Sequence, residues 1–66
     1  MKITLNGKIT ELEKNITVSE LLQNLKIHSK LVVVEINGDI IQKDYFDNTF
    51  IKENDKVEVV RFVGGG

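Results

Sequence analysis

The chain has 66 residues, of which 41% are hydrophobic, no cysteine and a formal net charge of −1 at pH 7. This length allows one small domain, whose core leaves little room for an enclosed substrate pocket. The lack of cysteine excludes a disulfide framework, an iron–sulfur cluster and a thiolate zinc site. Acidic and basic residues are interspersed, which disfavours a nucleic-acid partner because such domains usually carry a basic stripe.

The N-terminal segment has the pattern of a β-hairpin. Residues 2–5 alternate polar and apolar side chains, the period of a half-buried strand. Asn6 and Gly7 follow, a pair that favours a type I′ turn because both residues tolerate a positive φ. Residues 8–13 fit the returning strand, so we expect a hairpin over residues 1–13.

A capped helix is predicted for residues 18–26. Thr17 and Glu20 have the spacing of a capping box, in which each side chain accepts a hydrogen bond from the other residue's backbone N–H. Ile16 and Leu21 occupy the two positions of a hydrophobic staple. Apolar residues then repeat with the helical period on one face: Val18, Leu21, Leu22 and Leu25.

The second half of the chain predicts three further strands, at residues 31–36, 39–42 and 56–62. A second Asn-Gly pair separates the first two of them, and a turn at residues 53–55 precedes the last. Residues 43–50 have no clean period. We expect a loop there with one turn of 3₁₀ helix, anchored by Phe46 and Phe50.

This order of elements predicts an α+β roll, in which a mixed sheet of four to five strands carries one helix on one face. Val57 and Val59 of the last strand then point to one side, and Val60 and Phe62 to the other. Val60 and Phe62 either form an exposed apolar surface for a partner or pack against the 43–50 loop. Both readings stay open at this stage.

Internal motifs give little evidence for catalysis. His28 is the single histidine and has no nucleophile or acid partner at a recognisable spacing, so a structural role near the helix end is favoured. Five carboxylates in the second half do not fit a calcium loop and are expected to form a solvated rim: Asp39, Asp44, Asp47, Glu53 and Asp55. We therefore expect no metal site and no cofactor bound by the chain itself.

The chain ends in Val63 followed by Gly64, Gly65 and Gly66. Such a run is compatible with an unstructured terminus or a cloning remnant. A functional interpretation starts from reach, because four extended residues span up to about 13 Å and glycines can thread a channel too narrow for side chains. The α-carboxylate of Gly66 would then be the reactive group, once ATP has activated it as an acyl adenylate.

Several features together resemble the ThiS family of sulfur carrier proteins of thiamine biosynthesis, which have a ubiquitin-like β-grasp fold. They are the segment EINGDII at residues 35–41, an aromatic residue at Phe46, and VEVVRFVGGG at residues 57–66. The resemblance covers the whole chain. It departs from the usual pattern at Gln42, Lys43, Phe46 and Asn54, positions in the loop and turn.

The resemblance implies a protein co-substrate rather than an enzyme. A ThiF-type enzyme would adenylate Gly66 with ATP and magnesium, a sulfur-donor protein would supply the sulfur, and the resulting thiocarboxylate would serve a ThiG-type thiazole synthase. Residues 1–63 would form the β-grasp domain and residues 64–66 a flexible functional tail, in which Gly64 and Gly65 thread the partner's channel. The surface expected to dock on partners comprises Val60, Arg61, Phe62 and Val63.

Alternative functions remain open from the sequence. A MoaD-like small subunit of molybdopterin synthase, or another sulfur carrier, shares the fold and the glycine ending. A β-grasp protein-interaction module without C-terminal chemistry is an alternative of a different class. An RNA-binding module is disfavoured by charge, and an enzyme is least favoured. The N-terminal residues contain no signal peptide and no stretch approaches the ~20 apolar residues of a membrane helix, so we expect a cytoplasmic protein without a membrane partner.

Overall fold

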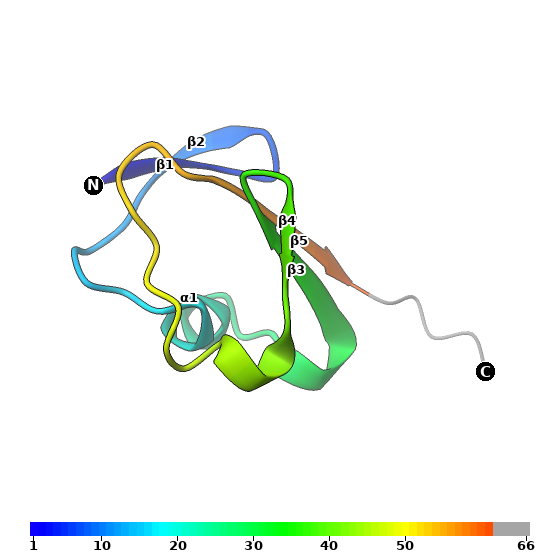
Figure 1. Cartoon of the computed structure of the whole chain (residues 1–66). Coiled ribbons are helices and arrows are strands. Elements are labelled where there is room, and N and C mark those ends of the chain that lie inside the picture. Colours follow the sequence, from blue (N-terminus) through cyan, green and yellow to red (C-terminus); the bar gives the residue numbers. More distant parts are fainter. Residues whose placement is uncertain (62–66) are drawn as a thin grey trace.

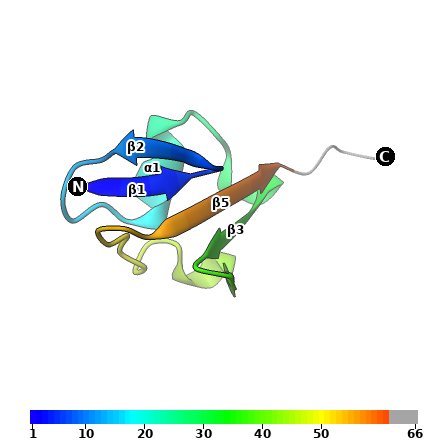
Figure 2. The same ribbon diagram turned by 90° about the horizontal axis from the view of Figure 1, so that it is seen from above.

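The computed structural model describes residues 1–61, which form one mixed sheet of five strands in the order β2-β1-β5-β3-β4. β1 and β5 pair in parallel, and the other neighbours pair antiparallel. Figure 2 shows β2, β1, β5 and β3 side by side with α1 behind them, so the helix covers one face of the sheet. The strands are β1 (Lys2–Leu5), β2 (Lys8–Glu11), β3 (Val32–Ile36), β4 (Asp39–Ile41) and β5 (Lys56–Arg61).

Both predicted Asn-Gly turns are confirmed. Asn6 and Gly7 connect β1 to β2 with φ values of 49° and 83°, and Asn37 and Gly38 connect β3 to β4 with 54° and 90°. A positive φ at both central residues is what a type I′ turn requires, and asparagine and glycine reach it at low cost. The two turns therefore fix the register of both hairpins from local sequence.

Helix α1 (Val18–Asn24) begins at the predicted cap. The Thr17 hydroxyl accepts from the Glu20 N–H at 3.1 Å, and the Glu20 carboxylate accepts from the Thr17 N–H at 2.9 Å. The N–H groups between them, those of Val18 and Ser19, donate to the carbonyl oxygens of Thr49 and Phe46. Both acceptors lie in the segment that follows β4. Figure 1 shows this segment running beside α1. The N-terminal donors of the helix are thus satisfied by the cap and by a distant part of the chain.

The helix ends at Asn24, two residues before the predicted boundary at residue 26. Lys26 has a φ of 58°, which stops the right-handed helix. The Lys26 N–H donates to the Gln23 carbonyl and the Ile27 N–H to the Leu22 carbonyl, both at 3.0 Å. This is the Schellman arrangement, with lysine at the position that glycine usually occupies.

The core lies between α1, the following loops and the covered face of the sheet. Phe46 is 3% exposed and anchors the 43–50 loop as predicted, next to the 3₁₀ turn Lys43–Tyr45. The prediction for Phe50 is wrong, because Phe50 is 53% exposed. Its backbone bridges Thr17, and this pairing places Ile51 in the core instead. The buried apolar residues are Ile3, Ile16, Val18, Leu21, Leu22, Val32, Val34, Ile36, Phe46, Ile51 and Val57.

Three strands are shorter than predicted. β2 ends at Glu11, and the chain then turns toward the helix at Asn15, where φ is 60°. β3 begins at Val32, since Ser29–Leu31 form a 3₁₀ turn. β4 ends at Ile41 because the next 3₁₀ turn begins directly behind it. At β3 and β4 the boundary lies where a 3₁₀ turn, invisible to strand periodicity, adjoins the strand.

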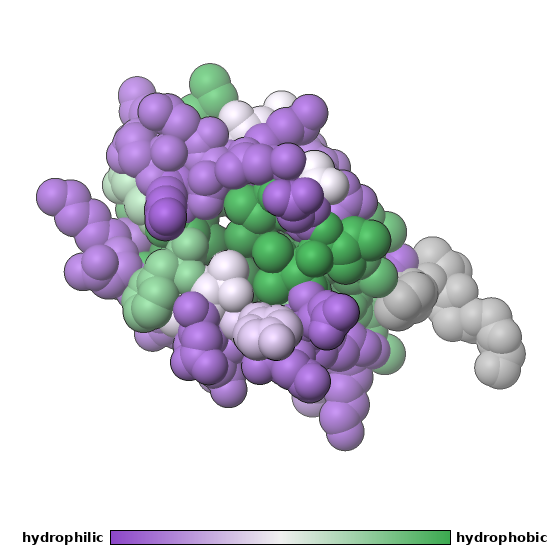
Figure 3. Space-filling view, viewed as in Figure 1, coloured by the Kyte–Doolittle hydropathy of each residue, from purple (hydrophilic) through white to green (hydrophobic). Residues whose placement is uncertain are grey.

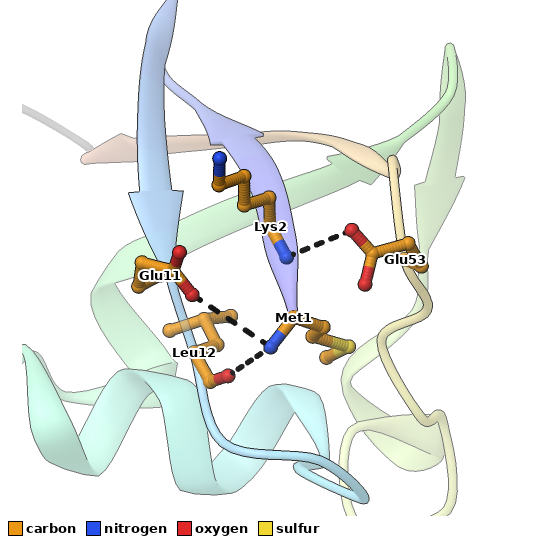
Figure 4. A network of polar contacts seen from close by, with 5 residues as sticks. All are labelled: Met1, Lys2, Glu11, Leu12 and Glu53. Carbon is orange, nitrogen blue, oxygen red and sulfur yellow. Dashed lines mark hydrogen bonds and ion pairs between the residues drawn. The ribbon is translucent and has the colours of Figure 1, made fainter.

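Polar contacts fasten the start of β1 to the end of β2 and to the turn before β5 (Figure 4). The Met1 ammonium group donates to the Leu12 carbonyl at 2.7 Å and lies 3.9 Å from the Glu11 carboxylate. On the other side, the Lys2 N–H donates to the Glu53 carboxylate at 3.0 Å. Asn54, one of the departures from the family pattern, has a φ of 70° in the turn before β5, a left-handed conformation that asparagine tolerates.

Within residues 1–61, no helix has the length and apolar character needed to cross a membrane.

Candidate functional site

The predicted site lies on β5 and on the residues that follow it. Val60 and Arg61 are the last residues of β5 that the structure describes. The other predicted site residues, which are Phe62, Val63, Gly64, Gly65 and Gly66, lie outside the described residues. The structure therefore does not test the predicted chemistry at Gly66. It does not test the predicted tail or its boundary at residue 64 either.

β5 is held mainly by β3 at its C-terminal end. The ladder with β3 runs from the Ile36–Val57 pair to the Val32–Arg61 pair. The ladder with β1 ends much earlier, at the Leu5–Val57 pair. The last residues of β5 therefore extend beyond the ladder with β1 while they remain paired to β3.

The two faces of β5 differ in exposure as the sequence pattern predicted. Val57 is fully buried and Val59 half-buried toward α1, whereas Val60 is 53% exposed on the opposite face. Val60 lies opposite Val33 of β3. It lines a hollow of about 330 Å³ with Glu35, Gly38, Lys56 and Glu58, none of which belongs to the 43–50 loop. For Val60, the exposed-surface reading is therefore confirmed over packing against that loop.

Apolar side chains from β3 and β4 extend this surface, and the sequence interpretation missed them. Ile40 is 67% exposed and lies opposite Glu35, on the same face as Val33 and Val60. A second hollow, of about 360 Å³, is lined by Val33, Ile40 and Ile41 among others. Figure 3 shows an apolar area along the β4 side of the molecule, bordered by hydrophilic side chains. Residues 32–36 read VVVEI, a nearly continuous apolar run, so only the strand register separates the residues of its two faces.

We call the surface formed by Val33, Glu35, Ile40, Glu58 and Val60 the open face. It combines three apolar side chains with two carboxylates that lie directly opposite one another, Glu35 on β3 and Glu58 on β5. Lys56 lies on the same side of β5 and lines the same hollow. An apolar surface with a charged centre, next to the end of the described chain, is suited to binding another protein.

The geometry around His28 does not indicate a catalytic site. His28 is exposed, its carbonyl accepts from the Leu31 N–H at 3.1 Å, and it lines an open hollow of about 520 Å³ with Ser19, Lys26 and Asp47 among others. In that hollow the Ser19 hydroxyl donates to the Asp47 carboxylate. No group of three or more potential metal ligands occurs in the part of the chain that the structure describes.

Two of the predicted rim carboxylates instead organise turns. Asp55 accepts from the Lys52 N–H at 2.8 Å and from the Asn37 side chain at 3.0 Å. Glu53 accepts from the Lys2 N–H, as described above. These contacts give Asp55 and Glu53 roles in the turn before β5, which sequence spacing did not indicate.

Comparison with known proteins gives a consistent picture over the full chain. The model of the ThiS family matches residues 3–66. The sulfur carrier protein ThiS of Bacillus subtilis (strain 168) is 37% identical over 65 residues, which cover 97% of this chain and 98% of that protein. A crystal structure of the thiamine biosynthesis protein (ThiS) from Geobacter metallireducens has a TM-score of 0.86 and 39% identity, with both chains fully covered. This structural match confirms the predicted β-grasp fold.

A further relative is much longer. A thiazole synthase of Paramagnetospirillum magneticum (strain ATCC 700264 / AMB-1) is 36% identical over 66 residues. The match covers all of this chain but 20% of that enzyme, so the chain spans about one fifth of this relative's length.

Proposed function

The chain belongs to the ThiS family, and from this membership we propose that it is a sulfur carrier protein of thiamine biosynthesis that carries sulfur on the carboxyl group of Gly66. The observation that carries the proposal is the family match, which extends to residue 66 and so includes the three terminal glycines. In this proposal residues 64–66 act as the functional tail and residues 1–63 as the domain that presents it.

The proposed reaction has two steps at the Gly66 carboxyl group. A carboxylate oxygen attacks the α-phosphorus of ATP, the bond to the β-phosphate breaks and pyrophosphate leaves. Nucleophilic sulfur, for example sulfide, then attacks the carbonyl carbon of the acyl adenylate and AMP leaves, which produces the thiocarboxylate. A ThiF-type enzyme would bind ATP and magnesium for the first step, so this chain acts as a co-substrate and holds no cofactor itself.

The proposed acceptor of the sulfur is a ThiG-type thiazole synthase. The relative from Paramagnetospirillum magneticum supports this choice, because a thiazole synthase there contains a segment similar to this whole chain. A carrier and its acceptor joined in one polypeptide meet at a high effective concentration, which favours productive transfer.

The structure supports a docking role for β5 in this reaction. β5 is paired along its length to β3, so its end is held in a fixed direction relative to the sheet. Val60 and Arg61 lie immediately before the proposed tail, and Val60 is exposed. A partner that receives the carboxyl group of Gly66 lies within about 18 Å of Arg61, because five extended residues span at most that distance. The exposed end of β5 is therefore the part of the domain best placed to contact it.

The test is intact-mass analysis after incubation of the full chain with a ThiF-type enzyme, ATP, magnesium and sulfide. We expect a mass increase equal to the exchange of one oxygen for one sulfur. The control variant lacks Gly66 and should remain unmodified, with an unchanged circular dichroism spectrum. Modification of the truncated chain, or no modification of the full chain, would contradict the proposal.

An interaction module without C-terminal chemistry is the second candidate, and the exposed apolar side chains of the open face favour it. Such a module would bind its partner equally well with and without Gly66. Partner binding that persists in the truncated chain, together with no thiocarboxylate in the full chain, would select this alternative.

A further inference from the structure

Glu35 and Glu58 lie directly opposite one another in the middle of the open face. They form one rung of the antiparallel ladder between β3 and β5, and both are half-buried. The side chains of directly opposite residues project from the same side of a sheet, with Cβ atoms roughly 4.5–5.5 Å apart. Two negative charges are thus held next to each other by the backbone.

This pair works against the stability of the sheet. Like charges directly opposite each other on neighbouring strands are destabilising. Among residues 1–61, the ion pair within 4.0 Å joins Met1 and Glu11, so neither Glu35 nor Glu58 has a basic partner at that distance. Lys56 lines the same hollow without forming such an ion pair in the described part of the chain.

The apolar neighbours increase the electrostatic cost of the glutamate pair when a partner covers the open face. Val33 and Val60 form the neighbouring rung of β3 and β5 on the same face. Ile40 lies opposite Glu35 on β4, also on this face. A protein that buries these apolar side chains also removes water from the two carboxylates. Burying a charge without an opposite charge is strongly unfavourable, whereas a paired and hydrogen-bonded charge is tolerated.

From this juxtaposition we propose that Glu35 and Glu58 together form a receptor for one basic side chain of the adenylating enzyme, flanked by apolar contacts to Val33, Ile40 and Val60. Arginine suits the receptor best, because its planar guanidinium group has five donors and can bind two carboxylates at once. The inference rests on the proposed function, in which that enzyme binds the tail and so lies close to the end of β5.

A receptor role and a structural role of the two glutamates predict different effects of substitution on stability and on binding. Replacing one carboxylate relieves the repulsion in the unbound domain, so the fold becomes slightly more stable or stays unchanged. The same replacement removes half of the receptor, so the adenylating enzyme binds more weakly. Recognition by the adenylating enzyme therefore weakens without any loss of stability.

The experiment compares Glu35→Gln, Glu58→Gln and Glu58→Lys with Glu13→Gln and Glu13→Lys. Glu13 is an exposed residue outside the helices and strands, so its variants make the same charge changes away from the open face. The full chain serves as substrate in ATP–pyrophosphate exchange with the ThiF-type enzyme, and each variant is also unfolded in urea. The readouts are KM, kcat, the salt dependence of KM and the urea midpoint.

We expect each glutamine variant on the open face to raise KM about five- to tenfold, and Glu58→Lys to raise it more than about thirtyfold, with little change in kcat. The urea midpoint of Glu58→Lys should rise, because the ammonium group that this substitution introduces can pair with Glu35 across the strands. Added salt should raise the KM of the parent chain more steeply than that of the variants. Both Glu13 variants should behave like the parent.

Two failures are distinguishable. If the parent chain supports no exchange at all, the proposed function fails and the receptor with it. If the parent is active and Glu58→Lys has the KM of Glu13→Lys, the receptor is wrong while the proposed function stands. An equal loss of stability and of activity in the glutamine variants would also overturn the receptor, because it would indicate a purely structural role.

Discussion

The side-chain oxygen of Asn6 accepts a hydrogen bond from the Val59 backbone N–H at 2.8 Å. This contact lies just past the last rung between β1 and β5, where β5 loses β1 as a backbone partner. Asn6 therefore combines two tasks: it adopts the positive φ of the hairpin turn and it satisfies a strand N–H that the turn would otherwise leave unpaired.

Replacing Asn6 separates these two tasks. Asn6→Gly keeps access to positive φ but removes the acceptor, and we expect the free energy of unfolding to fall by about 1–2 kcal/mol. Asn6→Asp retains an acceptor and should lose less. Urea unfolding measures the stability, and hydrogen exchange of the Val59 amide reports the bond directly. Unchanged exchange of Val59 in Asn6→Gly would show that the bond contributes nothing.

Lys26 offers a stabilising substitution. It occupies the left-handed position of the Schellman motif with a φ of 58°, a conformation that costs a residue with a Cβ roughly 1 kcal/mol. Lys26→Gly should raise the free energy of unfolding by about 0.5–1 kcal/mol. Lys26→Ala is the control, because it removes the lysine side chain without relieving the backbone. Equal stabilities of the two variants would contradict the explanation.

Local signals in the sequence predicted most of the fold. The Thr17–Glu20 capping box and the two Asn-Gly turns depend on residues close in the chain, and the structure reproduces all of them. The ThiS family and its β-grasp fold, expected from the pattern of residues 35–66, are confirmed as well. The helix end was misplaced because Leu25 continues the apolar stripe although the backbone already turns at Lys26.

The candidate site was only partly predictable, because it depends on strand register. The sequence identified Val60 on the exposed side of the last strand, and this position is confirmed. It could not pair Glu58 with Glu35, since that pairing needs the order and offset of β3 and β5. Phe50 was misread for a similar reason: its bridge to Thr17 decides which residue of the 50–51 pair faces the core.

The contrast between Phe46 and Phe50 can be measured. Phe46 is 3% exposed and Phe50 is 53% exposed. Phe46→Ala should lower the free energy of unfolding by about 3–5 kcal/mol, enough to leave a domain of this size largely unfolded. Phe50→Ala should cost less than about 1 kcal/mol. Circular dichroism during thermal unfolding is the measurement, and Phe46→Leu provides a milder variant if Phe46→Ala does not fold. Similar losses at both positions would contradict the assignment of the core.

The position of Val60 predicts a separation of folding from recognition. Val60 is 53% exposed on the open face, beside the end of the described chain. Ile9 is 79% exposed on β2, on the same side of the sheet but two strands away from β5. Val60→Asp and Ile9→Asp each add one charge at an exposed apolar position, so both variants should fold with a urea midpoint close to that of the parent.

Their effects on the adenylating enzyme should differ. Val60→Asp would bury a carboxylate against an apolar partner surface and add a third negative charge next to Glu35 and Glu58, so the KM in ATP–pyrophosphate exchange should rise by at least about tenfold. Ile9→Asp should leave KM within about twofold of the parent, because β2 lies at the opposite edge of the sheet from β4. If both variants raise KM equally, docking extends across the whole uncovered side of the sheet rather than the part formed by β3, β4 and β5.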